Sequence, residues 1–97
     1  MARKIIWTKR ATSKLGSLTE YLNQKWSENV AKQFILRTFE LVELLSKQPN
    51  IGPFQNSEKK IRGILISKHN RLFYRTTSHK IIILNIFDTR SNPKQQT

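Results

Sequence analysis

Apolar positions in the first half of the chain recur every three or four residues, which is the spacing of one face of an α-helix. Thr8 and Ser27 are both good N-cap residues, because a side-chain oxygen at that position accepts a free backbone N–H of the first turn. The pattern therefore predicts two helices, over residues 8–26 and 27–47, with Pro49 stopping the second. Almost no linker separates them, so we expect an antiparallel helical hairpin.

Strand-forming residues dominate on either side of this hairpin. A β-branched and aromatic stretch at residues 4–7 precedes it, and three segments rich in Ile, Leu, Phe and Tyr follow it, at residues 60–67, 71–76 and 80–87. The element order βααβββ over residues 1–97 makes a single domain. We expect an α+β fold, in which the helical hairpin packs on one face of a small, mostly antiparallel four-stranded sheet.

Strand parity predicts how the two faces of this sheet differ, because side chains alternate between the faces. The even-numbered set is almost wholly apolar and is assigned to the face under the helices: Leu72, Tyr74, Ile82, Leu84 and Ile86. The odd-numbered set mixes arginine with apolar groups and is assigned to the opposite, open face: Arg71, Phe73, Arg75, Ile83 and Asn85. A four-residue turn would add Arg62, Ile64 and Ile66 to the open face. An exposed apolar patch of that kind usually indicates a partner.

Charge narrows the choice of partner. Eighteen Lys and Arg stand against six Asp and Glu, which gives a net charge of +12 at pH 7. Such a surface attracts polyanions or an acidic protein. The chain has no cysteine, and its two histidines lie in separate turns, so we expect no metal site. Its apolar runs are too short to cross a membrane, and we expect a cytoplasmic protein without membrane contact.

The order of these segments resembles that of the RelE/ParE superfamily of bacterial toxins. The stretch Arg71-Leu72-Phe73-Tyr74-Arg75 is similar to the Arg-x-x-Tyr strand of these toxins, and Arg90-Ser91-Asn92-Pro93 is similar to their closing Arg-x-x-Pro segment. The resemblance covers nearly the whole chain. It implies a growth-inhibiting toxin of a type II toxin–antitoxin module, which needs no cofactor and is held inactive by a cognate antitoxin protein.

Two mechanisms are known in this superfamily. RelE-like members cut mRNA on the ribosome, whereas ParE-like members inhibit DNA gyrase and cut nothing. Metal-free RNA cleavage needs a proton acceptor, a proton donor and positive charge near the phosphate. The resemblance places Arg71 and Arg90 at positions used for phosphate stabilisation, with Arg62 as a third candidate. Further candidates for substrate binding are Lys60, Arg75 and Lys94.

A proton donor and acceptor are harder to name. RelE-like cutters commonly carry Tyr or His after the closing arginine, and residues 91–97 contain neither. Tyr74 is expected under the helices, and His69 and His79 fall in turns between strands. The strong positive charge favours mRNA cleavage on the ribosome as the leading hypothesis. The missing acid–base pair favours a gyrase inhibitor without catalytic activity as the alternative, and a non-toxic nucleic-acid-binding relic is the third.

Overall fold

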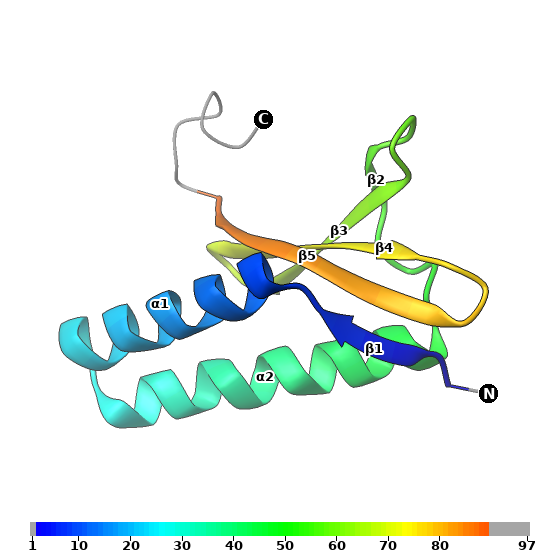
Figure 1. Ribbon diagram of the computed structural model, residues 1–97. Helices are drawn as coiled ribbons and strands as arrows, with labels where there is room; N and C mark the ends of the chain where they lie inside the picture. The colour runs from blue at the N-terminus through cyan, green and yellow to red at the C-terminus, as the bar shows by residue number, and fades with distance from the viewer. Residues whose placement is uncertain (1, 90–97) are drawn as a thin grey trace.

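A computed structural model describes residues 2–89 as a five-stranded sheet with two helices against one face (Figure 1). The elements in chain order are strand β1 (Lys4–Trp7), helices α1 (Lys9–Lys25) and α2 (Glu28–Lys47), and strands β2 (Phe54–Asn56), β3 (Ile61–Ser67), β4 (Asn70–Thr76) and β5 (Lys80–Asp88). The strand order across the sheet is β1-β5-β4-β3-β2. β1 runs parallel to β5, and the other neighbours are antiparallel.

The α+β class and the helical hairpin on one face of the sheet are confirmed, with one strand more than expected. The additional strand, β2, is three residues long and wholly exposed. A strand this short carries no alternating pattern of apolar and polar residues, which is the signal by which strands are recognised in a sequence. Neither described helix is long and apolar enough to cross a membrane.

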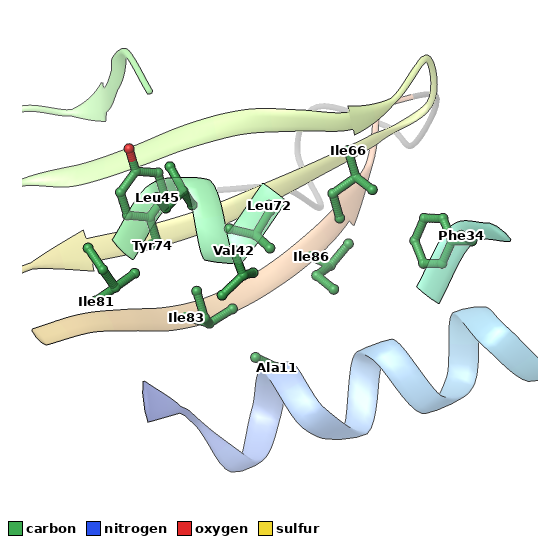
Figure 2. Close-up of a cluster of buried hydrophobic side chains, with 10 residues drawn as sticks. All are labelled: Ala11, Phe34, Val42, Leu45, Ile66, Leu72, Tyr74, Ile81, Ile83 and Ile86. Atoms are coloured by element: carbon green, nitrogen blue, oxygen red, sulfur yellow. The ribbon is translucent and has the colours of Figure 1, made fainter. Parts of the chain in front are cut away.

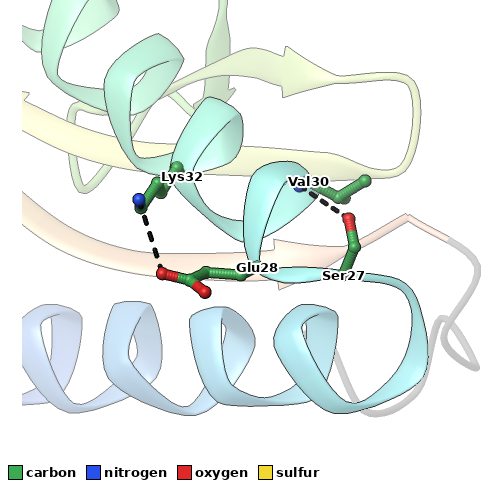
Figure 3. Close-up of polar contacts among 4 residues, drawn as sticks. All are labelled: Ser27, Glu28, Val30 and Lys32. Atoms are coloured by element: carbon green, nitrogen blue, oxygen red, sulfur yellow. Dashed lines mark hydrogen bonds and ion pairs between the residues drawn. The ribbon is translucent and has the colours of Figure 1, made fainter.

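Both helices begin at the predicted caps. The Thr8 hydroxyl accepts the backbone N–H of Ala11 at 3.2 Å and donates to the carbonyl of Ile83 at 2.7 Å, so the same side chain caps α1 and ties it to β5. Ser27 accepts the N–H of Val30 at 3.1 Å at the start of α2 (Figure 3). Ser27 directly follows Trp26, the C-cap of α1, so its capping hydrogen bond explains how α2 begins with almost no linker after α1.

A β-bulge in β5 changes the predicted assignment of its two faces. Phe73 of β4 pairs with Asn85, but the next residue, Tyr74, pairs with Ile83, so Leu84 is an extra residue in β5. An extra residue moves every later side chain to the other face of the strand.

The buried residues of β5 are therefore odd-numbered before the bulge and even-numbered after it: Ile81, Ile83 and Ile86. The prediction was wrong for Ile83, which lies in the core, and for Ile82 and Leu84, which remain partly exposed. It was right for Leu72, Tyr74 and Ile86, which are fully buried.

A second bulge, at Ile66, shifts the pairing of β3 with β4 by one residue. Arg62 consequently pairs with Tyr74, and Ile64 pairs with Leu72, on the face under the helices. Ile66 is itself fully buried. The prediction that Arg62, Ile64 and Ile66 lie on the open face was therefore wrong.

The core lies between the sheet and the helical hairpin, and Figure 2 shows its side chains converging from both layers. Its members are Ala11, Phe34, Val42, Leu45, Ile66, Leu72, Tyr74, Ile81, Ile83 and Ile86. Full burial of one such aliphatic or aromatic side chain stabilises the fold by about 1.5–3 kcal/mol. Both helices lie on this face, so neither covers the opposite face of the sheet.

Candidate functional site

The uncovered face of the sheet carries a hollow of about 750 Å³, which we call the open-face hollow. Strands β4 and β5 supply its floor, and the N-terminal end of α1 borders it. The connection through β2 into β3 rises from the sheet on the side away from the helices (Figure 1), and its residues Gln55, Asn56 and Lys59 line the hollow as a wall. The residues that line the hollow are Thr8, Arg10, Gln55, Asn56, Lys59, Ile61, Phe73, Arg75, Leu84, Asn85 and Phe87.

The floor of the open-face hollow is apolar. The rings of Phe73 and Phe87 meet with their centroids 4.9 Å apart and their planes inclined by 58°. Leu84, the extra residue of the bulge, lies beside them. All three side chains remain partly exposed. Exposed apolar groups gathered in a depression are typical of a binding surface.

The walls of the open-face hollow are basic. Arg10, Lys59 and Arg75 line it, and among the lining residues within 2–89 there is no Asp or Glu. The Arg75 guanidinium donates to the Lys59 carbonyl at 3.1 Å, and Arg71, which is not itself a lining residue, donates at 3.1 Å to the side-chain oxygen of the lining residue Gln55. Both acceptors are neutral, so these hydrogen bonds leave the positive charge of each arginine intact. The hollow therefore suits phosphate or carboxylate groups.

Arg62 lies apart from this hollow. Its guanidinium donates to the carbonyls of Gly52 at 2.8 Å and Asn50 at 3.2 Å, in the segment that joins α2 to β2. The guanidinium carbon is 4.0 Å from the centroid of the Phe54 ring, in a cation–π contact. The structure thus brings Arg71 and Arg75 together on the open face and places Arg62 elsewhere.

Tyr74, opposite Arg62 in the sheet, is fully buried. Its phenol donates to the Pro49 carbonyl at 2.9 Å and accepts the Gly52 N–H at 3.0 Å. Burial raises the pKa of this phenol above its usual value of 10.0, although the Gly52 N–H and the positive charge of Arg62 partly oppose the shift. Tyr74 is therefore a neutral phenol at physiological pH, and it faces the helices as predicted.

The remaining candidates fall outside the open-face hollow or outside the described residues. Lys60 is exposed in the β2–β3 turn, where its φ of 57° is left-handed, and it borders a separate shallow depression with Arg62. His69 lies in the turn between β3 and β4, and His79 lies in the turn between β4 and β5, as expected. Arg90 and Lys94 lie outside residues 2–89. Within that range, no three His, Asp or Glu side chains gather closely enough to hold a metal ion.

Two cationic residues of the hollow, Arg10 and Lys59, were not among the predicted site residues. Arg10 had a detectable signal, because a cation in the first turn of a helix opposes the helix dipole and is unfavourable for stability. A cation at such a position is a candidate for function. Lys59 had no comparable signal, since it reaches the hollow only through the path of the β2–β3 connection.

Comparison with known proteins identifies a family and a shared fold. The family described as "ParE toxin of type II toxin-antitoxin system, parDE" matches residues 5–93. Among curated proteins, none matches the chain.

Several solved structures share the architecture. A chain of the chromosomal ParDE TA system from P. aeruginosa is 18% identical, with a TM-score of 0.77, and the match covers 92% of this chain and 98% of that one. A chain of the RelBE2 toxin–antitoxin complex from Mycobacterium tuberculosis is 17% identical, with a TM-score of 0.59 and coverage of 91% and 99%. A chain of the E. coli DinJ–YafQ toxin–antitoxin complex is also 17% identical, with a TM-score of 0.61 and coverage of 91% and 93%. At this level of identity the likeness concerns the fold.

Proposed function

Since the chain belongs to the ParE toxin family of type II toxin–antitoxin systems, we propose that it inhibits growth by binding DNA gyrase through the open-face hollow, without cutting nucleic acid. Such a toxin needs a surface that grips a protein target. An apolar floor with cationic walls offers that surface, because apolar contacts slow dissociation while charges guide association and orientation.

The observation that carries this proposal is the kind of side chain that lines the hollow. Cleavage of RNA requires groups that accept and donate a proton beside the phosphate. The described lining contains no His, Tyr, Asp or Glu. Tyr74 is buried on the other face of the sheet, with its hydroxyl proton directed to the Pro49 carbonyl. The described part of the hollow is thus better equipped for binding than for catalysis.

Ribosome-dependent mRNA cleavage is the second candidate, and a specific observation favours it. The paired rings of Phe73 and Phe87 lie beside Arg75, which is an arrangement that can stack a base and hold a phosphate. Arg90 and Lys94 could add phosphate contacts from the tail. In this reading, the toxin acts on mRNA in the ribosome, and a general acid and base come from outside the described lining.

A cognate antitoxin is the second partner that we propose. The M. tuberculosis and E. coli structures that share this fold are complexes with antitoxins. A segment that combines acidic and apolar side chains would satisfy both the walls and the floor of the open-face hollow, and would block it toward the target. Both targets, gyrase and the ribosome, imply action in the cytoplasm.

Brief induction of the chain in a bacterium separates the two mechanisms. We expect plasmid supercoiling and replication to fail while an abundant message stays intact in primer extension. Cuts in that message at ribosome-phased positions, with normal supercoiling, would instead support mRNA cleavage.

Matched charge variants test the site itself. Arg10→Ala and Arg75→Ala remove cations from the hollow, whereas Lys25→Ala removes the same charge from the exposed last turn of α1. We expect the first two variants to arrest growth less strongly at equal expression and the third to act as the wild type does. Full toxicity of both arginine variants would place the target-binding surface elsewhere.

A further inference from the structure

The wall of the open-face hollow is a projecting segment, residues 53–61, which we call the arm. It contributes Gln55, Asn56, Lys59 and Ile61 to the lining. Every residue from 53 to 60 is exposed. Burial of apolar side chains within the arm therefore cannot fix its position, and the arm needs another anchor if the hollow is to keep its shape.

The first anchor is the hydroxyl of Tyr74. Its ring lies in the core cluster, and its oxygen points out of that cluster (Figure 2). There it bridges the Pro49 carbonyl and the Gly52 N–H, at the base of the arm. Contact at this point is close, because a Cβ added to Gly52 would lie 2.7 Å from the Tyr74 oxygen and 2.9 Å from its Cε1. Only glycine lets the backbone come this near to the phenol.

The second anchor is the guanidinium of Arg62. It binds the carbonyls of Asn50 and Gly52 and covers the ring of Phe54, the first residue of β2. The backbone supports the same junction, since the Gly63 N–H donates to the Pro53 carbonyl at 3.0 Å. Arg62 thus binds two carbonyls of the arm base through one terminal nitrogen while its planar group covers the Phe54 ring, and an ammonium lacks this flat surface for stacking.

The anchored arm in turn holds the arginines of the open face. Gln55 accepts from Arg71, and the Lys59 carbonyl accepts from Arg75. On the open face, the Gln55 and Arg71 side chains close over Gly63, where an added Cβ would lie 2.7 Å from Gln55 Cγ and 3.2 Å from Arg71 Cδ. A displacement of the arm base would therefore reach Arg75 in the hollow, and Arg71 on the same face of the sheet, through these two hydrogen bonds.

We propose that Tyr74 and Arg62 are positioning residues, which fix the arm and thereby the placement of Arg71 and Arg75, and that Arg62 itself touches no target. This inference rests on the proposed function of the open-face hollow. It assigns Arg62 a role through other residues, in place of the direct phosphate contact predicted from the sequence. A supporting layer of this kind is what holds a binding geometry within narrow limits.

Hydrogen exchange of the purified chain tests the anchors without reference to toxicity. Tyr74→Phe removes only the buried hydroxyl, and Tyr21→Phe removes a hydroxyl from a half-exposed tyrosine of α1 as the matched control. We expect the Gly52 and Gly63 amides to exchange roughly tenfold faster in Tyr74→Phe, as for the loss of about one hydrogen bond, with α1 and α2 unchanged. A folded Tyr74→Phe variant in which these amides exchange as in the wild type would overturn the proposal.

Charge-conserving variants connect the anchors to activity. Arg62→Lys keeps the charge but loses the planar guanidinium that covers the Phe54 ring while it binds the two carbonyls. It leaves the core intact, so it still tests the positioning role if Tyr74→Phe does not fold. We expect it to speed exchange in the arm base and to raise the inducer level for half-maximal growth arrest by roughly tenfold, on the same hydrogen-bond scale.

The outcomes separate this inference from the proposed function. Faster exchange in Arg62→Lys with full toxicity, or reduced toxicity with unchanged exchange, would overturn the positioning role. In the second case Arg62 would be a direct contact residue. If Arg10→Ala and Arg75→Ala are also both fully toxic, the open-face hollow itself is not the target-binding site, and the proposed function fails whatever the exchange of the arm shows.

Discussion

Two neighbouring residues of β5, Ile83 and Leu84, should respond in opposite ways to truncation. The bulge places Ile83 in the core, fully buried, and Leu84 on the floor of the open-face hollow, partly exposed. Strict alternation along the strand would give the reverse assignment. Ile83→Ala should therefore reduce stability, and Leu84→Ala should reduce toxicity in a protein that still folds.

The size of the difference follows from burial. Ile83→Ala removes a fully buried side chain and leaves a cavity, at a cost of about 2–5 kcal/mol. Domains of this kind have a total free energy of unfolding of only about 5–15 kcal/mol. Each kcal/mol lowers the Tm of a domain of 60–100 residues by about 4–8 °C, so the Tm should fall by at least about 8 °C. Leu84→Ala loses only part of a side-chain burial, about 1 kcal/mol or less.

Urea denaturation followed by circular dichroism measures these costs, and induction in a bacterium measures toxicity. Ile83→Val is the matched control for the core position, with an expected cost of about 0.5–1.5 kcal/mol. Equal destabilisation by Ile83→Ala and Leu84→Ala, or a larger loss for Leu84→Ala, would contradict the bulge and the two faces that it defines.

Three further predictions concern single contacts. Because burial raises the pKa of Tyr74, the folded protein holds the phenolic proton more tightly than the unfolded chain does. The contribution of the neutral Tyr74 phenol to stability is therefore complete below about pH 10 and is lost as the pH rises beyond it. The urea midpoint of Tyr74→Phe should thus decline less than that of the wild type above about pH 10. Thr8→Ala should cost about 1–2 kcal/mol in thermal unfolding, since the hydroxyl both caps α1 and binds the carbonyl of Ile83. Lys32→Ala should change the free energy of unfolding in urea by less than about 0.5 kcal/mol, because its ion pair with Glu28 at 3.4 Å is exposed (Figure 3).

The parts of the fold that could be predicted from the sequence are those with local causes. The helix starts at Thr8 and Ser27 follow from side-chain capping, and the two helices follow from a stripe of apolar residues. The faces of β3 and β5 could not be read in the same way. Each contains one bulged residue inside an apolar segment, Ile66 or Leu84, and a run of apolar residues gives no sign of where parity changes.

The candidate site was predictable to a similar extent. Arg71 and Arg75 are both odd-numbered residues of one strand, so their shared face followed from β4 alone. Arg10 and Lys59 join them only because α1 begins beside β5 and the arm folds over the sheet. That convergence depends on tertiary contacts between distant segments, for which the sequence around each residue carries little information.

The parallel pairing of β1 with β5 also means that the fold can be completed only near the end of translation. The Thr8 hydroxyl and the Ile83 carbonyl that it binds are 75 positions apart. At a translation rate of about 5–20 residues per second, β5 is made roughly 4–15 s after β1. Until then the nascent chain lacks Ile83 in its core and both Leu84 and Phe87 in its hollow. If the open-face hollow binds the target as proposed, the binding surface is incomplete for nearly the whole of elongation, and an antitoxin that captured the chain at release would act before a complete toxin had diffused away.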